Sequence, residues 1–137
     1  MSDDRVVSLK DRRSGSRAVL GGCLVFANDQ LRMPMAIGGV APEWTTIDPV
    51  EVQLEGRSEP TPVHARFGMI DHSPDGRSGS VSENEHGVTA DLYFERDLFL
   101  AFQSAALSSA PLTLFVTFSA RDGAPPNLML AIERRTT

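Results

Sequence analysis

Four segments of the chain alternate between apolar and polar residues, which is the pattern of a β-strand with one buried face. The clearest is 50–55, where valine and leucine alternate with glutamate and glutamine. The others are 88–95, 112–119 and 128–133. Because all four segments repeat with a period of two, the sequence predicts a mainly β fold.

Turn residues and glycines indicate how these strands connect. The segment 121–126 is rich in Gly, Pro and Asp, so 112–119 and 128–133 are expected to form an antiparallel hairpin. The run 17–27 is apolar throughout and contains Gly21–Gly22, which predicts a long central strand with a bulge or bend. Two weaker strand candidates are 5–9 and 31–37.

One segment, 97–107, repeats its apolar residues at helical spacing. Asp97 suits a first helical turn, and Pro111 follows the end. Several strands and one short helix favour an antiparallel β-sandwich or a partly open barrel over a fold of alternating strands and helices. With 137 residues, no repeat and no long linker, the chain is expected to form a single β domain over 1–137.

Charge and hydropathy argue against two classes of partner. The net charge is -5 and the sequence pI is about 5.1, whereas nucleic-acid binders cluster Lys and Arg. No apolar stretch approaches the length needed to span a bilayer. The sequence therefore predicts no nucleic-acid partner and no membrane partner.

The amino terminus, the cysteine content and the absence of known motifs bear on the cellular compartment and on a cofactor. The amino terminus shows no signal-peptide pattern, and the single cysteine, Cys23, lies in an apolar run that suits a reducing compartment. Arg outnumbers Lys by 12 to 1, a bias typical of GC-rich bacterial genomes. A bacterial cytoplasmic protein is expected. Glycine-rich phosphate loops, paired cysteines and His-Glu-x-x-His segments are absent from the sequence, so no cofactor is predicted.

The segment 64–95 contains all three histidines, so it is the first place to look for a catalytic or metal-binding site. Ser73–Gly76 fits a type I turn that would join 64–72 and 77–83 as a hairpin, and Asn84–Gly87 would close a second turn.

The first of these turns sets a register. Pairing Ser73 with Gly76 places Arg66 opposite Glu83 and His64 opposite Glu85. His64, Glu85 and His86 would then gather at one end of the sheet, and two imidazoles with a carboxylate suffice to bind a divalent metal. A solvated turn with a cross-strand Arg66 and Glu83 pair explains the same residues.

Four apolar or aromatic residues fall on strand faces that the alternation leaves outside the core. In the hairpin register, Phe67, Met69 and Tyr93 face away from the core, and Phe115 lies on the polar face of 112–119. An apolar cluster rimmed by small polar groups is typical of an interface, although burial within the same chain accounts for it equally well.

These patterns favour a noncatalytic binding or assembly module that self-associates or binds a protein partner. The alternative function is a small metal-dependent enzyme that uses His64, Glu85 and His86.

Overall fold

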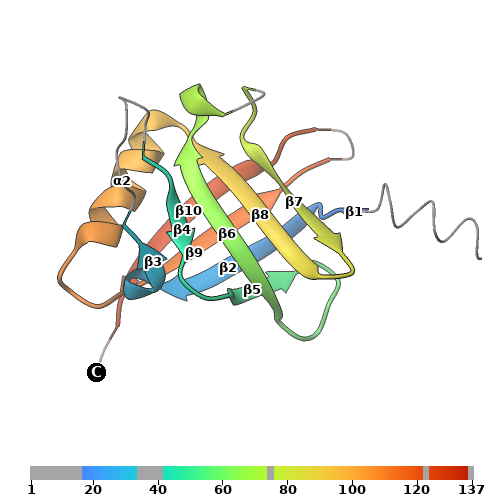
Figure 1. Cartoon of the computed structure of the whole chain (residues 1–137), viewed down its shortest axis with the longest axis horizontal. Helices are drawn as coiled ribbons and strands as arrows, with labels where there is room; N and C mark the ends of the chain where they lie inside the picture. Colours follow the sequence, from blue (N-terminus) through green and yellow to red (C-terminus); the bar gives the residue numbers. More distant parts are fainter. Residues whose placement is uncertain (1–16, 34–41, 74–75, 122–123, 136–137) are drawn as a thin grey trace, which may run out of the picture.

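The computed structural model describes residues 17–33, 42–73, 76–121 and 124–135. Within them, ten strands form one sheet, accompanied by one α-helix and two short 3-10 helices (Figure 1). The predicted mainly β class with one short helix is confirmed. The strands are β1 (Arg17–Ala18), β2 (Gly21–Ala27), β3 (Leu31–Arg32), β4 (Trp44–Thr46), β5 (Val50–Leu54), β6 (Thr61–Met69), β7 (Gly79–Asn84), β8 (Gly87–Phe94), β9 (Leu112–Ser119) and β10 (Asn127–Arg134). The helices are η1 (Asn28–Gln30), η2 (Ile70–His72) and α2 (Arg96–Leu107).

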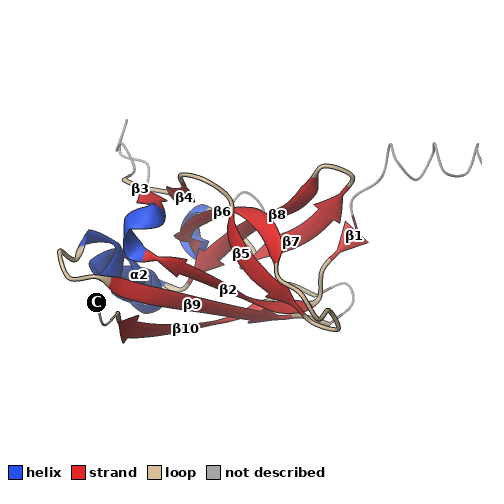
Figure 2. Ribbon diagram, turned by 90° about the horizontal axis from the view of Figure 1, so that it is seen from below, coloured by secondary structure: helices blue, strands red, loops and turns tan. Residues whose placement is uncertain are grey.

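The sheet curls into a half-barrel. Its strand order is β1-β7-β8-β6-β5-β2-β9-β10, and β3 joins it through β4, which also pairs with β6. In Figure 2, β9 and β10 form the lower layer, and β7 and β8 lie above them. The residue before β7 contacts the residue before β10, where the Ser78 hydroxyl donates a hydrogen bond to the carbonyl oxygen of Pro126. Among the described strands, β10 lies at one border of the sheet.

The core fills the inside of the curl, and helix α2 covers one end of it (Figure 1). Phe102 of α2 is fully buried, and its ring centroid lies 4.8 Å from that of Phe67 and 5.3 Å from that of Phe94. Three strands and the helix therefore meet in one aromatic cluster, since Phe26 of β2 lies 5.4 Å from Phe67.

Within the described ranges, no helix has the length and apolar character needed to cross a membrane.

Local patterns predicted most elements correctly. The segments 50–55, 88–95, 112–119 and 128–133 correspond to β5, β8, β9 and β10, and 97–107 corresponds to α2. The β9–β10 hairpin is confirmed, with Leu130 paired to Val116.

The amino-terminal strand predictions have mixed outcomes. The run 17–27 forms two strands instead of one, because β1 pairs with β7 at one border while β2 lies centrally between β5 and β9. Only β3 is described within 31–37, and 5–9 lies outside the described residues.

The predicted hairpin between 64–72 and 77–83 is wrong. Strand β8 lies between β6 and β7, running parallel to β6 and antiparallel to β7. Parallel pairing places Phe67 beside Leu92, and both side chains are fully buried. Strand β7, in which Val81 is the buried apolar residue, suits a place next to the border. The second predicted turn is confirmed, because Asn84 pairs with Gly87.

Candidate functional site

The parallel pairing separates the residues of the predicted metal cluster. His64 lies in β6, where it pairs with Thr89 of β8, whereas Glu85 and His86 occupy the turn between β7 and β8. His86 Nε2 is 3.6 Å from Glu85 Oε1, and both side chains are exposed. Over the described ranges, no group of three or more His, Cys, Asp or Glu side chains could hold a metal ion. The structure therefore does not bring His64, Glu85 and His86 together as a metal site.

The expected Arg66 and Glu83 pair is also absent from this arrangement. Arg66 Nε instead lies 3.7 Å from Asp91 Oδ1. Glu83 accepts hydrogen bonds from Arg57 Nη1 at 3.0 Å and from Arg17 Nη2 at 3.3 Å. The hydrogen bond from Arg57 lowers the pKa of Glu83 below its ordinary value, and Arg17 acts in the same direction.

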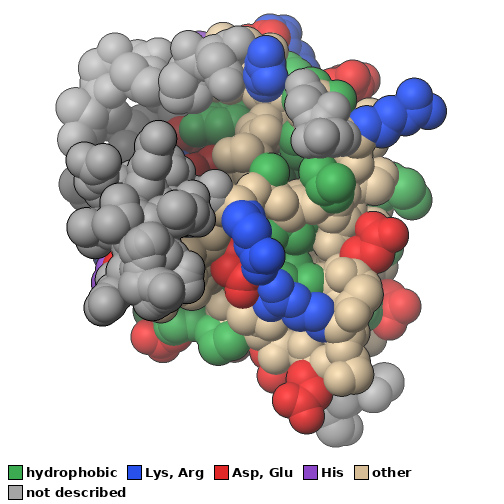
Figure 3. Space-filling view, turned by 90° about the vertical axis from the view of Figure 1, so that its right-hand side faces the viewer, with side chains coloured by type: hydrophobic (Ala, Val, Ile, Leu, Met, Phe, Trp, Pro, Cys, Tyr) green, Lys and Arg blue, Asp and Glu red, His purple; other side chains and the backbone are tan. Residues whose placement is uncertain are grey.

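The ion cluster of Glu83, Arg57 and Arg17 links β1 and the turn after β5 to β7. It borders a shallow cleft of about 230 Å³. Figure 3 shows the side of the molecule that lies on the right of Figure 1, where basic and acidic side chains are interspersed. Because the Glu83 carboxylate already accepts from two guanidinium groups, the cluster serves cross-strand attachment.

The structure places the four apolar candidates in different environments. Phe67 is fully buried in the core, so the expectation that it faces away from the core is wrong. Met69 is half-buried and packs against the core, so the expectation that it faces away from the core is also wrong. Tyr93 is only 5% exposed, and its hydroxyl lies 3.5 Å from Glu43 Oε2. Burial, with a smaller effect of the Glu43 carboxylate, raises the pKa of Tyr93. Phe115 is half-buried on β9.

A cleft of about 290 Å³ opens beside the carboxyl end of α2, and Asn28 forms part of its wall. The Asn28 side chain is buried, and its amide nitrogen donates to the carbonyl oxygens of Ala105, Ser108 and Ala110 at 3.0–3.2 Å. Its amide oxygen accepts from the backbone N–H of Leu112 at 3.2 Å.

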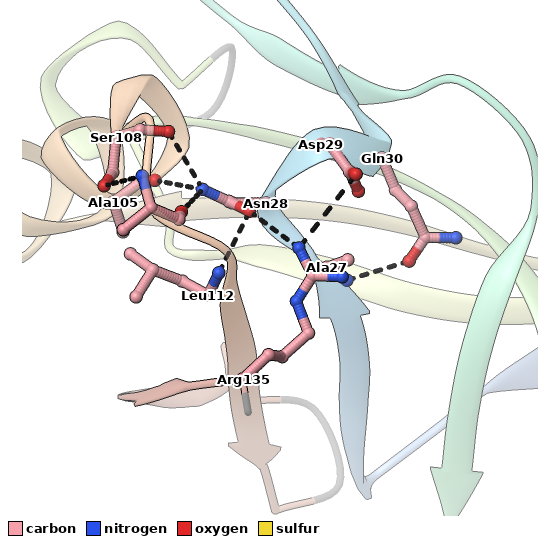
Figure 4. A network of polar contacts seen from close by, with 9 residues as sticks. Ala27, Asn28, Asp29, Gln30, Ala105, Ser108, Leu112 and Arg135 are labelled. Atoms are coloured by element: carbon pink, nitrogen blue, oxygen red, sulfur yellow. Dashed lines mark hydrogen bonds and ion pairs between the residues drawn. The ribbon is translucent and has the colours of Figure 1, made fainter. Parts of the chain in front are cut away.

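Arg135 completes this network. Its Nη2 donates to Asn28 Oδ1 at 3.3 Å and lies 4.0 Å from Asp29 Oδ2, and its Nε is buried out of reach of solvent (Figure 4). Arg135 Nε itself has no hydrogen-bond partner, but the other polar groups named here bind one another and anchor the end of α2. We assign them a structural role.

A different feature lies at the border of the sheet, on β10. Among the described strands, β10 pairs with β9 alone. Five consecutive apolar residues, Leu128–Ile132, form its centre. Met129 is 67% exposed on the outer face, and Ile132 is 40% exposed on the inner face. An exposed border strand that is apolar on both faces is unusual, because such an edge can pair with another chain.

The hydrogen-bond phase shows which backbone groups of β10 face the open edge. Arg135 N donates to Pro111 O at 2.9 Å, which continues the β9–β10 ladder. Hydrogen-bonded pairs recur at every second residue of an antiparallel ladder, so the odd-numbered residues of β10 bond to β9. The backbone N–H and C=O groups that point away from β9 belong to Leu128, Leu130, Ile132 and Arg134.

The outer face next to this edge is also apolar. Val25, Phe115 and Ala131 lie side by side across β2, β9 and β10, and the row ends at Glu51 of β5. Val25 is 38% exposed. Of the four predicted interface residues, Phe115 is therefore the one that lies in an apolar surface patch.

Sequence reasoning missed the open edge, although a signal for it was present. Residues 128–133 were expected to bury Leu128, Leu130 and Ile132, which share the inner face. The intervening Met129 and Ala131 are apolar as well, and a strand that is apolar on both faces indicates cover on both faces.

Compared with known proteins, the chain matches no family model, no curated protein and no solved structure.

Proposed function

We propose that this chain is a noncatalytic assembly module that pairs with a second copy of itself through the open edge of β10. The observation that carries the proposal is the exposed apolar centre of β10, Leu128–Ile132, on a border strand that pairs with β9 alone among the described strands.

The physical argument rests on how proteins treat sheet borders. Border strands are normally protected by charges, prolines or short length, because their outward N–H and C=O groups template further pairing. In β10 these protections lie at the ends, with Pro125–Pro126 before the strand and Glu133–Arg134 at its close. The eight-residue strand leaves its centre unprotected, which supports pairing with another strand at that point.

A second copy is the occupant we favour because the same edge is present on every molecule. Pairing of two β10 strands uses both open edges, so the assembly closes as a dimer instead of growing into a fibre. A strand of this length buries less surface than a standard interface, so the expected affinity is micromolar or weaker.

The experiment measures molar mass by sedimentation equilibrium from low micromolar to the highest soluble concentration. The wild type should approach the mass of a dimer. Ile132→Lys places a charge on the edge and should remain a folded monomer.

The matched control is Ile47→Lys. Ile47 is 48% exposed, close to the 40% of Ile132, but it lies in the loop between β4 and β5. This control should dimerise like the wild type. A wild type that stays monomeric at every concentration, or an Ile132→Lys variant that dimerises as well as Ile47→Lys, would overturn the proposal.

A further inference from the structure

The geometry of the open edge of β10 restricts the direction and the register in which two copies can pair. We infer that the two β10 strands pair antiparallel about a two-fold axis at Leu130, so that each copy's Leu130 lies opposite the other's. This inference rests on the proposed function and names the contacts that the dimer makes.

Antiparallel pairing follows from the two faces of the sheet. A two-fold axis perpendicular to the sheet reverses the strand direction and keeps both inner faces on one side. The inner-face residues Leu128, Leu130 and Ile132 of the two copies then form one continuous apolar face. Parallel pairing about a two-fold axis along the strands would join the inner face of one copy to the outer face of the other.

The hydrogen-bond phase limits the position of the axis. Only even-numbered residues of β10 point their backbone groups outward, so hydrogen-bonded pairs across the dimer must join even residues. With the axis at Leu130, Leu128 lies opposite Ile132, and every inner-face pair in the centre is apolar. On the outer face, Met129 lies opposite Ala131.

The ends of the strand also match in this register. Asn127 lies opposite Glu133, so the amide can donate to the carboxylate at both ends of the dimer. The carboxyl end of helix α2 is linked through Asn28 to Arg135, just beyond the end of β10. Arg135 lies five residues beyond Leu130, roughly 17 Å along the strand. The two helices therefore lie at opposite ends of the paired strands.

The neighbouring axes are less favourable. An axis at Ala131 would place Leu128 opposite Arg134 and Met129 opposite Glu133, which sets charges against apolar side chains. An axis at Met129 would place Pro126, which has no N–H and whose carbonyl oxygen already accepts from Ser78, opposite Ile132 in the apolar centre of the strand. With the axis at Leu130, Pro126 lies opposite Arg134, at the last position of β10.

Disulfide formation distinguishes these registers. In a Cys23→Ser background, Leu130→Cys and Ala131→Cys are each oxidised with glutathione disulfide, and the covalent dimer is quantified by non-reducing electrophoresis. With the axis at Leu130, the two introduced thiols of Leu130→Cys lie on Cα atoms about 5.5 Å apart, within disulfide range. Those of Ala131→Cys lie diagonally at about 8 Å, beyond that range.

Leu130→Cys should therefore cross-link to near completion and Ala131→Cys at least about tenfold less. The unsubstituted protein provides an internal control. Its native Cys23 lies on β2, two strands from β10, so the two copies of Cys23 would be roughly 24 Å apart and should not cross-link.

A second pair of variants avoids the half-buried Leu130. Met129→Cys and Ala131→Cys lie on the exposed outer face, and a mixture of the two should form the mixed disulfide more readily than either forms its own. Preferential cross-linking of Ala131→Cys alone in a dimeric protein would overturn the register and leave the proposed function standing. A protein that is monomeric and cross-links at neither position would overturn both. Dimers that cross-link in none of these variants would also overturn the register, and the Ile132→Lys test then decides the proposed function.

Discussion

The side-chain amide of Asn28 donates a hydrogen bond to the carbonyl oxygen of Ala105, 3.1 Å away at the carboxyl end of helix α2. The last carbonyl groups of a helix have no partner within the helix itself. Asn28 in η1 supplies a donor to Ala105 beside the one from Ser108 N, and it also accepts from the backbone N–H of Leu112, where β9 begins. A single buried side chain therefore joins η1, α2 and β9.

Replacing Asn28 by Ala should lower the free energy of unfolding by about 1–3 kcal/mol, because it removes the amide that donates to the carbonyl oxygens of Ala105, Ser108 and Ala110. The matched control is Gln30→Ala. The Gln30 side-chain oxygen accepts from Ala27 N in an exposed bond of 2.8 Å, so its loss should cost less than about 1 kcal/mol. Urea unfolding of both variants measures the difference, and equal midpoints would contradict the assigned role of Asn28.

The aromatic cluster under α2 is expected to be the most sensitive part of the core. Phe102→Ala removes a fully buried ring that contacts Phe67 and Phe94, and should cost about 3–5 kcal/mol. Leu100→Ala, on the same helix at 51% exposure, should change stability by less than about 1 kcal/mol. Thermal unfolding followed by circular dichroism compares the two. A small loss for Phe102→Ala would mean that α2 does not cap the core as described.

The ion cluster at β7 predicts a dependence on pH. Arg57 holds the pKa of Glu83 below its ordinary value, so ionised Glu83 stabilises the folded state above that value. The stabilisation that ionised Glu83 gives to the folded state is lost as the pH falls from the ordinary pKa of a glutamate to the lowered pKa of Glu83. The stability difference between the wild type and Glu83→Gln should therefore be present at neutral pH and vanish in acid.

The comparison variant for this experiment is Glu51→Gln, at an exposed position on β5. It should change stability little at either pH. Because Glu83 is close to solvent, the effect should be small and should shrink in high salt. A Glu83→Gln difference that grows as the pH falls would contradict the described pairing.

Proline substitution tests the hydrogen-bond phase of β10. The Ala131 N–H points to β9 and the Ile132 N–H points to the open edge. Ala131→Pro should remove a ladder bond and destabilise the monomer by about 3 kcal/mol or more, whereas Ile132→Pro should leave the monomer folded and abolish dimerisation. Melting temperature and molar mass are measured on both. The opposite order of stabilities would mean that the phase is reversed.

Local patterning predicted the elements whose burial is decided by neighbouring residues. The alternation at 50–55 identified β5, since Val52 and Leu54 must be buried while Glu51 and Gln53 stay in solvent. The turn residues after 119 identified the β9–β10 hairpin, because two strands joined by a short turn pair with each other.

The parallel pairing of β6 with β8 could not be predicted in this way. Ser73–Gly76 suits a hairpin turn, but local residues do not determine whether the following strand pairs with β6 or lies one place further out. The choice depends on burying Phe67 and Leu92 side by side, which is a contact between distant segments. The error also inverted the face assigned to Phe67.

The candidate site was missed for a related reason. Alternation shows which face of a strand is buried, but it does not show whether the strand lies at a border of the sheet. Phe115 was recognised as unusual, while its neighbours Val25 and Ala131 became part of the same patch only through the order β2-β9-β10.

Amide hydrogen exchange along β10, followed by NMR as a function of protein concentration, tests the self-pairing of this edge most directly. At low concentration, the amides of Met129 and Ala131 should be protected by β9, and those of Leu130 and Ile132 should exchange rapidly. As concentration rises, Leu130 and Ile132 should become protected while Met129 and Ala131 change little. An alternation of fast and slow exchange that persists unchanged at every concentration would contradict pairing through β10.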